Sequence, residues 1–342
     1  MKKVGILTFH WATNFGAVLQ AYALQRYLIE IGFDTDIINY RPYRVLLIQE
    51  ITQLRNKAFH RKERALHEFR TKLQMSRKTI YCAKNLKSLF GKYDYVIAGS
   101  DQVWNESFAL GAEGKPTLSY FLHGCPPSTK RISYAASLGT DDVCERYVEC
   151  VRPELARFSA ISVREESGKE ILQKLGFDAE VVCDPTLLLT RETYLDITSD
   201  VKTDAPKVFA YILHEHAETG KIAEYVKKRK NADSQGPDIY GLNEWLFCIQ
   251  HSQVVVTNSF HGVMLSLILN KPFVAVLIKG SGMNDRIRTI FSAVGPGHRA
   301  IDTYDENKLD ALLDEAIPWD TVNVGLNELR ERGRVFLRTA LS

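Results

Sequence analysis

The segment Gln253–Val276 constrains the fold of this chain more than any other part of the sequence. It opens with three consecutive valines, Val254–Val256, which predict a short strand buried on both faces of a sheet. A polar cluster follows, apolar residues then recur at helical spacing as far as Leu269, and the run Phe273–Ile278 predicts a second strand. A strand, a turn, a helix and a strand in this order indicate an α/β protein with a parallel sheet.

The polar cluster, Thr257-Asn258-Ser259-Phe260-His261-Gly262, follows the first of these predicted strands. Ligands of open parallel sheets bind at the carboxyl ends of the strands, and the free amides of a helix start attract anions. Two interpretations of His261 stay open on this segment alone. It is either a general acid beside a bound anion, or an exposed residue on the first turn of a helix that Asn258 or Ser259 caps.

Composition indicates a soluble globular protein of 342 residues, long enough for two domains of ordinary size. No run of about 18 apolar residues occurs, so we expect no transmembrane helix. The six cysteines show no CxxC spacing, which favours a reducing, cytoplasmic setting over a disulfide framework or a zinc site.

Charge is concentrated in segment 44–92, which holds 13 Lys and Arg against three acids, a net charge of +10 where the whole chain carries +3. We expect amphipathic helices there, over Tyr43–Gln74 with a break and over Lys84–Phe90. One interpretation is a solvated helical face; the other is a surface that steers anionic substrates or touches the inner face of the membrane. Few aromatic residues are interleaved with the charges, so we expect no nucleic-acid partner.

The N-terminal part predicts a strand over Val4–Thr8, a helix over Ala17–Ile31 and a strand over Thr35–Tyr40. The turn before the helix lacks GxGxxG, which argues against a standard NAD site. In that turn Asn14 can cap the helix, and Gly16 lets the backbone approach a ligand closely.

Three further predicted strands end in small or polar residues. Tyr93–Ala98 leads to a loop with Asp101, Gln102 and Trp104, which reads either as a sugar-contacting loop or as a structural turn. Arg131–Ala135 leads to Ser137. Ala160–Val163 leads to Arg164, which suits bidentate binding of phosphate or carboxylate, or else pairs with Glu165 or Glu166.

A second α/β series follows Pro185. We therefore expect an N-terminal domain over residues 1–190, with a helical insertion at 44–92, and a C-terminal domain over 191–342 whose last helix packs back on the first. The predicted elements of the second series are strand Lys207–Leu213, helix Ala217–Arg229, polar linker Lys230–Pro237, short strand Ile239–Gly241, helix Leu242–Gln250, and closing helices Glu306–Ala316 and Val324–Leu341. The run His214-Glu215-His216 has no further ligands at metal spacing, so we expect no metal.

The strand-end loops occur in six blocks, in the order TFHWATNFGAVLQAYAL, VIAGSDQVWN, ISYAASLG, ISVREESGKEIL, VVCDPTLLL and VVVTNSFHGVMLSLILNKPFVAV. Taken together, these blocks resemble the polysaccharide pyruvyl transferase family over about residues 4–292. The resemblance implies an α/β fold of two Rossmann-like domains facing a cleft, similar to the GT-B glycosyltransferase fold.

The resemblance implies transfer of the pyruvyl group of phosphoenolpyruvate onto two hydroxyls of a sugar, with release of phosphate. We expect a 4,6-ketal on a hexose of a capsule, exopolysaccharide or cell-wall glycan precursor. His261 matches the family's catalytic histidine motif and is the expected general acid. Arg164 matches an arginine that holds the donor. Asp101 is the candidate base by its position and type.

The expected donor and acceptor contacts extend over several loops, and phosphoenolpyruvate is expected as donor substrate with no other cofactor. The acceptor is expected to be a nucleotide- or lipid-linked sugar, and no oligomeric state follows from the sequence. Two alternatives remain: a nucleotide-sugar-dependent glycosyltransferase of GT-B type, and a non-catalytic glycan- or anion-binding module. The donor residues are Arg164, Asn258, Ser259, Phe260, Gly262, Ser137, Asn14 and Gly16; the acceptor residues are Gln102, Trp104 and Arg286.

Overall fold

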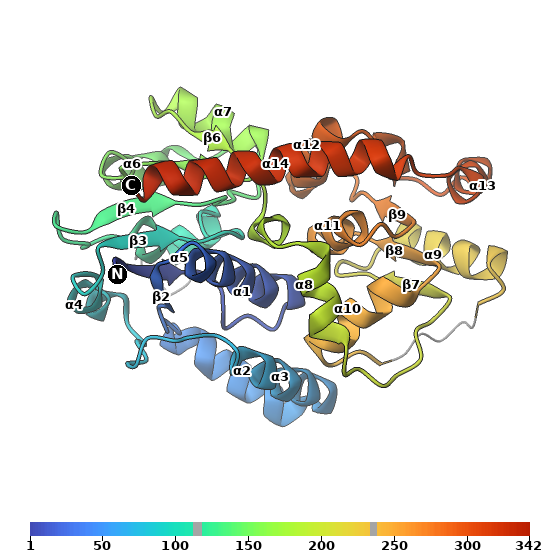
Figure 1. Ribbon diagram of the computed structural model, residues 1–342, viewed down its shortest axis with the longest axis horizontal. Coiled ribbons are helices and arrows are strands. Elements are labelled where there is room, and N and C mark those ends of the chain that lie inside the picture. The colour runs from blue at the N-terminus through green and yellow to red at the C-terminus, as the bar shows by residue number, and fades with distance from the viewer. Residues whose placement is uncertain (112–117, 233–237) are drawn as a thin grey trace. The chain divides into compact units, whose positions relative to one another are not determined.

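The computed structural model describes residues 1–111, 118–232 and 238–342, which form two compact units (Figure 1). The first unit comprises Met1–Leu188 together with Arg330–Ser342, and the second comprises Leu189–Leu329. Parts of the expected loop over residues 111–129 and of the expected linker over residues 230–237 lie outside the described residues. Both units are built on parallel sheets, so the predicted α/β class with two Rossmann-like domains is confirmed.

The first unit contains a parallel sheet in the order β2–β1–β3–β4. Isolated parallel bridges from Ile132 to Ala160 and from Ala136 to Val163 carry the pairing on to β5, which pairs with β6. The strand order reverses between β1 and β3, and ligands of open α/β sheets bind outside the carboxyl ends of strands at such a reversal. The strands are β1 (Lys3–Leu7), β2 (Asp34–Ile37), β3 (Tyr95–Ala98), β4 (Lys130–Ser133), β5 (Ser162–Val163) and β6 (Glu180–Val181).

Helix α1 follows β1, and most of its residues from Phe15 to Leu28 are buried. The Asn14 side chain caps it by accepting a hydrogen bond from the amide of Ala17 at 3.2 Å. The basic segment forms α2 and α3, so helices over most of that segment are confirmed. The helices of this unit are α1 (Phe15–Glu30), α2 (Tyr43–Arg55), α3 (Lys57–Arg70), η1 (Ala83–Asn85), α4 (Lys87–Phe90), α5 (Glu106–Gly111), η2 (Ser119–Phe121), α6 (Glu145–Leu155), α7 (Glu166–Lys174) and η3 (Pro185–Leu188).

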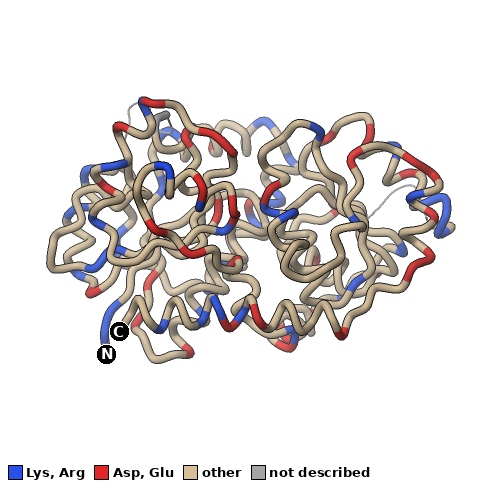
Figure 2. Tube along the Cα trace, turned by 90° about the horizontal axis from the view of Figure 1, so that it is seen from above, with Lys and Arg blue, Asp and Glu red and all other residues tan. Residues whose placement is uncertain are grey.

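The long helix α14 (Trp319–Ala340) begins in the second unit and ends in the first. Gly333 allows its last turns to approach β4 closely, because a Cβ at this position would lie 2.5 Å from the hydroxyl of Tyr134. The chain then ends beside its own beginning, as Figure 2 shows, and the hydroxyl of Tyr95 donates to the carbonyl of Ser342 at 3.0 Å. The C-terminal residues Arg330–Ser342 therefore pack as part of the first unit.

The second unit contains a parallel sheet in the order β10–β9–β8–β7, without a reversal. Helix α9 has the bounds that the sequence predicts, whereas the expected strand Ile239–Gly241 is wrong, because these residues lead without pairing into α10. The sequence interpretation also missed α8 and β10. The elements are α8 (Arg191–Thr198), β7 (Val208–Tyr211), α9 (Ala217–Arg229), α10 (Leu242–His251), β8 (Val254–Thr257), α11 (Phe260–Ile268), β9 (Phe273–Val276), η4 (Gly282–Asn284), α12 (Asp285–Val294), η5 (Gly297–Arg299), β10 (Ala300–Ile301) and α13 (Glu306–Asp314).

Candidate functional site

The loops after β1 and β3 are hydrogen-bonded to each other at the strand-order reversal of the first unit. The hydroxyl of Thr8 donates to the carbonyl of Ser100 at 2.9 Å and accepts from the side-chain amide of Gln20 at 2.8 Å. Asn14 caps α1 at the end of the β1 loop, and Gly16 is buried in the first turn of α1. The sequence-predicted residues of these two loops therefore lie along one edge of the sheet.

Asp101 has a left-handed backbone, with φ of 79°, which is uncommon for a residue other than glycine. Such conformations cost about 1–3 kcal/mol and persist where the surroundings enforce them. Here the amide of Ser137 donates to the Asp101 carbonyl at 2.9 Å, which extends the β3–β4 pairing. The carboxylate accepts from the Gln102 amide, lies 3.6 Å from the guanidinium of Arg164, and keeps a partly exposed side chain.

Arg164 lies in a buried ion-pair network instead of facing an open site. Its guanidinium donates to the carboxylate of Asp184 at 2.8 Å, and the exposed fraction of its side chain is 1%. The charges of Asp184 and Asp101 outweigh the effect of burial and raise the pKa of Arg164. Two carboxylates therefore pair with this arginine, and through one of them it anchors Asp101.

The acid that pairs with Arg164 was not among those considered from the sequence. Asp184 follows β6, 20 residues after the arginine. Glu165 has a different role, because its carboxylate accepts hydrogen bonds from the amides of Leu138 at 2.8 Å and Gly139 at 3.4 Å. Glu165 therefore fixes the loop that follows β4.

Ser137 and Gln102 lie at the same strand ends. Ser137 is fully buried, and among the described residues its hydroxyl has no hydrogen-bond partner. Gln102 packs over Gly139, where φ is +67° and a Cβ would lie 2.9 Å from the Gln102 side chain. The loop residues around Asp101 are thus brought together, with Gln102 half-buried.

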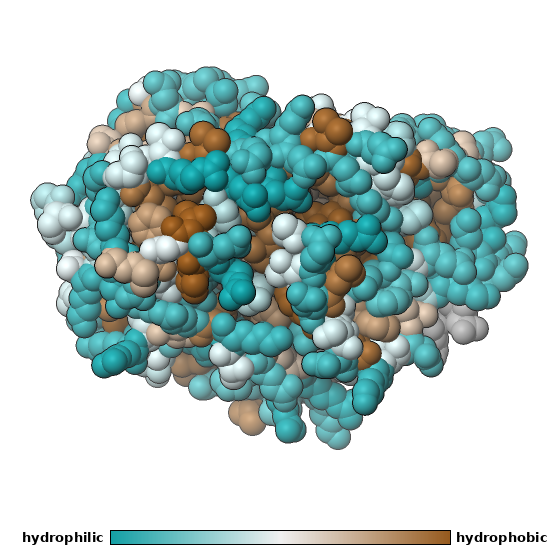
Figure 3. Space-filling model, in the orientation of Figure 1, coloured by the Kyte–Doolittle hydropathy of each residue, from teal (hydrophilic) through white to brown (hydrophobic). Residues whose placement is uncertain are grey.

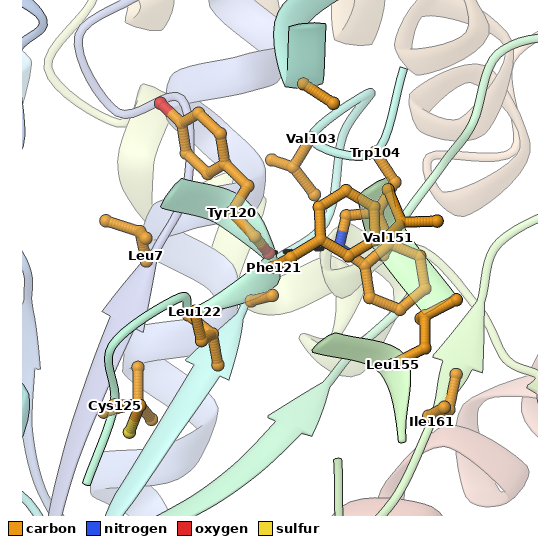
Figure 4. Close-up of a cluster of buried hydrophobic side chains, with 14 of the residues drawn as sticks. Leu7, Val103, Trp104, Tyr120, Phe121, Leu122, Cys125, Val151, Leu155 and Ile161 are labelled. Atoms are coloured by element: carbon orange, nitrogen blue, oxygen red, sulfur yellow. Dashed lines mark hydrogen bonds between the residues drawn. The ribbon is translucent and has the colours of Figure 1, made fainter. Parts of the chain in front are cut away.

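Trp104 is a core residue, which corrects its expected role in sugar stacking. Its ring is fully buried and stacks on Phe121 with 5.0 Å between ring centroids (Figure 4). Its indole nitrogen donates to the carbonyl of Tyr120 at 3.0 Å. An aromatic ring contacts a sugar only through an exposed face, and this ring has none.

The sequence interpretation missed the groups that hold the loop after β1. Arg70, on α3, donates to the carbonyls of His10, Trp11 and Ala12 at 2.9, 3.1 and 2.8 Å and pairs with Glu63 at 2.6 Å. No local pattern signals this contact, because about 60 residues separate the arginine from the loop.

His10 is fully buried in the same loop and is unsuited to proton transfer near neutral pH. Burial, followed by the charge of Arg41, lowers its pKa to about 3. Its ring nitrogens lie 3.2 Å from the carbonyl of Thr8 and 3.3 Å from the side-chain oxygen of Asn39. His10 is therefore a neutral structural residue.

The candidate site of the second unit is built where β8 meets α11. Asn258 fixes the loop after β7, since its side chain accepts from the amide of Leu213 at 2.8 Å and donates to the carbonyl of His214 at 2.7 Å. Ser259 caps α11 by accepting from the amide of Gly262 at 3.3 Å. His261 follows on the first turn and is buried, with 6% exposure, so the alternative of an exposed histidine is wrong.

Phe260 and Arg286 complete this site. The guanidinium of Arg286 lies over the ring of Phe260, 5.7 Å from its centroid, and the Phe260 and His261 rings lie 5.3 Å apart. Arg286 comes from the first turn of α12, after a loop that Asn284 closes by bonding to both backbone groups of Ile278. An imidazole, a capped helix start and a cation therefore occupy one end of this sheet.

Gly262 is required by the close approach of α11 to β8. A Cβ at this position would lie 2.6 Å from the hydroxyl of Thr257. That hydroxyl donates to the carbonyl of Tyr211 at 2.6 Å and accepts from the amide of Ser259, so it has little freedom to move. Gly262 thus acts through packing.

The run His214-Glu215-His216 leads into α9. Within residues 1–111, 118–232 and 238–342, no group of three or more His, Cys, Asp or Glu is arranged to hold a metal ion. Across the same residues, no helix is long and apolar enough to cross a membrane.

Because each unit is built on a parallel sheet with helices, the protein belongs to the α/β class. The chain is similar in fold to UDP-GlcNAc 2-epimerases, which have a GT-B-like fold. The enzyme from Rickettsia bellii matches with a TM-score of 0.57 at 9% identity, over 100% of this chain and 96% of that one. The Neisseria meningitidis enzyme, solved bound to UDP-GlcNAc, matches with a TM-score of 0.53 at 10% identity, over 99% and 100%. The Methanocaldococcus jannaschii enzyme gives 0.53 at 13%, over 97% and 99%.

The family is narrower than this fold. The model of the polysaccharide pyruvyl transferase family matches residues 14–279, and the chain belongs to that family. This confirms the resemblance found in the sequence. No curated protein matches the chain.

Proposed function

We propose that this chain transfers the pyruvyl group of phosphoenolpyruvate to two hydroxyls of one sugar, forming a cyclic ketal and releasing phosphate. Family membership supports a pyruvyl transferase. The observation that carries the donor assignment is the position of His261 beside the capped start of α11, with Arg286 over Phe260. Phosphoenolpyruvate has a phosphate and a carboxylate, and helix-start amides and arginine are the groups that bind such anions.

In the proposed reaction His261 gives its proton to C3 of the enol, which becomes a methyl group. C2 then has oxocarbenium character and is attacked by one sugar hydroxyl. The C2–O bond to phosphate breaks, and the second hydroxyl closes the ketal ring. The two hydroxyl protons balance the proton gained by C3 and the one that leaves with phosphate.

The other assignments belong to the same proposal. Asp101 accepts a hydroxyl proton, Arg164 holds the Asp101 carboxylate, and Gln102 contacts the sugar. The sugar is a hexose of a capsule, exopolysaccharide or cell-wall precursor, ketalised at its 4- and 6-hydroxyls and carried by a nucleotide or a lipid in the cytoplasm. The donor is held by Asn258, Ser259, Phe260 and Gly262, with Ser137, Asn14 and Gly16 as further donor contacts. Arg286, which the sequence predicted as an acceptor contact, is assigned to the donor in this proposal, because its guanidinium lies over the ring of Phe260.

The test is phosphate release from phosphoenolpyruvate with a panel of nucleotide- and lipid-linked galactose, mannose and N-acetylmannosamine acceptors. We expect release with at least one acceptor, and a His261→Gln rate lower by about 10²–10⁴-fold, the usual contribution of a general acid. His251→Gln is the matched control, since His251 is exposed on α10 and stacks on Phe247. No release with any acceptor together with no phosphoenolpyruvate binding would contradict the proposal.

A nucleotide-sugar glycosyltransferase is the second candidate, favoured by similarity in fold to an epimerase solved with UDP-GlcNAc. If UDP raises the melting temperature of the chain and phosphoenolpyruvate does not, this candidate replaces the first. If His261→Ala leaves both ligand binding and the cellular phenotype intact, a non-catalytic binding module replaces both.

A further inference from the structure

Helix α2 (Tyr43–Arg55) turns its apolar side outward. None of its 13 residues is buried. Leu54 is 88% exposed and Ile48 is 57% exposed, although side chains of this kind normally face a core. Residues three and four apart share a helix face, so the exposed apolar residues make one continuous surface. This apolar face consists of Tyr43, Leu47, Ile48, Ile51 and Leu54.

The inward side of α2 is only half-buried and combines apolar Val45 and Leu46 with polar residues. The side-chain amide of Gln49 donates to the carbonyl of Trp11 at 3.2 Å, and Thr52 and Gln53 are half-buried. An ordinary surface helix buries its apolar stripe against the core, whereas most of the apolar side chains of α2 are exposed. The apolar face therefore adds nothing to the packing of the first unit.

Basic residues lie on and beside the apolar face. Arg44 and Arg55 are exposed on α2, and α3, which lies beside α2 in Figure 1, exposes further cations. The lower edge of Figure 3, in the region of these helices, is mostly hydrophilic, with an isolated hydrophobic group at its margin. The exposed acids of α2 and α3 are Glu50 and Glu68, against the exposed bases Arg44, Arg55, Lys57, Arg61 and Arg64.

A pocket of about 570 Å³ adjoins the start of α2. It combines two exposed tyrosines, Tyr43 and Tyr81, with the cations Arg44 and Lys84. The amide of Tyr43 donates to the carbonyl of Tyr81 at 3.0 Å, which fixes one wall to the other. Tyrosine favours the boundary between lipid and water, and arginine and lysine bind phosphate, so the pocket suits an anionic headgroup.

We propose that α2 docks the chain on an anionic lipid surface, with its apolar face in the headgroup boundary and its arginines on lipid phosphates. Charge decides between this occupant and a second copy of the chain. A symmetric dimer through this face would bring the excess positive charge of α2 and α3 in one copy against the same excess in the other. The docking stands on α2 and its neighbours alone and is independent of the reaction proposed above.

The experiment is vesicle co-sedimentation of the full chain with phosphatidylcholine alone and with phosphatidylcholine containing phosphatidylglycerol. We expect binding to the anionic vesicles, weakened by salt and much lower on neutral ones. The triple variant Ile48→Ser, Ile51→Ser, Leu54→Ser is expected to lose at least tenfold in affinity. Arg44→Glu with Arg55→Glu is expected to lose on the order of tenfold or more, because each basic residue near such a surface contributes about fivefold.

The control is Val324→Ser with Val335→Ser, which removes two exposed apolar side chains from α14 and is expected to change nothing. None of the substituted α2 residues is buried, so the variants are expected to fold, and their melting temperatures check this. Absence of vesicle binding, or equal binding to neutral and anionic vesicles, overturns the proposal. So does a dimer in solution that the α2 variants dissociate, because the face is then a contact between copies.

Discussion

The carboxyl strand ends of the two units are stabilised by different chemistry. In the first unit a buried ion pair, Arg164 with Asp184, joins the residues after β5 and β6. In the second unit neutral side chains hold the loops at the strand ends. Asn258 is hydrogen-bonded to the loop after β7, and Asn284 to the loop after β9. Arg164 in the first unit and His261 in the second, the two residues expected from the sequence to act on the donor, therefore have different surroundings.

The difference shows why residue type alone does not identify a site. Arg164 has the position and the chemistry of an anion ligand, yet its charge is already matched by two carboxylates. At the strand ends of the second unit, neutral amides fix the loops that border His261 and Arg286. An anion gains more from a cation and helix-start amides than from an arginine whose charge a buried carboxylate already balances.

The largest effect is expected from Arg164→Met. Removing this guanidinium leaves the carboxylate of Asp184 buried and uncompensated, and breaking such a pair typically lowers the free energy of unfolding by about 3–5 kcal/mol. Denaturant-induced unfolding measures the change. Arg131→Met is the control, because it breaks a second buried pair, with Glu154 at 2.7 Å. It is expected to be less destabilising, because the Glu154 carboxylate still contacts His123 at 2.8 Å and Arg157 at 3.9 Å.

Comparison of Arg164→Met with Arg131→Met shows whether Arg164 stabilises the fold or binds the donor. We expect both to retain phosphoenolpyruvate binding when measured at a temperature where they are folded. If Arg164→Met loses less than about 1 kcal/mol of stability but abolishes phosphoenolpyruvate binding, the arginine is a direct donor ligand and the comparison between the units is wrong.

A smaller effect is expected in the second unit from Gly262→Ala. The added Cβ would meet the Thr257 hydroxyl at 2.6 Å, and overpacking of this kind lowers the free energy of unfolding by about 1–3 kcal/mol. Gly220→Ala is the control in the same unit. It lies within α9 with nothing near its Cβ, and is expected to raise stability by about 0.5–1 kcal/mol, as measured by thermal unfolding. Equal effects of the two substitutions would contradict the packing role of Gly262.

The third effect depends on pH and concerns the buried His10. Its pKa is about 3 in the folded chain and about 6.5 when exposed, so between these values the unfolded chain binds a proton that the folded chain excludes. Stability contributed by His10 is therefore present above pH 6.5 and is lost on acidification, by about 1.4 kcal/mol for each pH unit below it.

Replacement of this histidine isolates its contribution. Unfolding measured from pH 7 to pH 5 is expected to show a shallower pH dependence for His10→Gln than for the natural chain. The same slope in both chains would mean that His10 is not held neutral by the fold.

The sequence predicted the α/β class, the family and most elements, because these depend on local periodicity and on the order of strand-end motifs. Helix α9 has its predicted bounds, and the turn before α11 has its predicted cap. Short elements were missed or misassigned. Strand β10 has two residues, and the run Ile239–Gly241 has the composition of a strand but pairs with no strand in the part of the chain that the structure describes.

Other features depended on contacts between residues far apart in the chain. The sequence predicted that the Trp104 ring stacks on a sugar, but Tyr120 and Phe121 contact this ring in the core. Whether Arg164 binds a ligand or a carboxylate depended on Asp184.

The sequence by itself determined where strands and helices form and that His261 follows a buried strand at a helix start, since neighbours along the chain fix these. Only the tertiary structure decided which side chains remain accessible and which charges are already paired, because burial and electrostatic partners come from residues that sequence spacing does not bring together. For the same reason it alone showed that the apolar side of α2 faces outward.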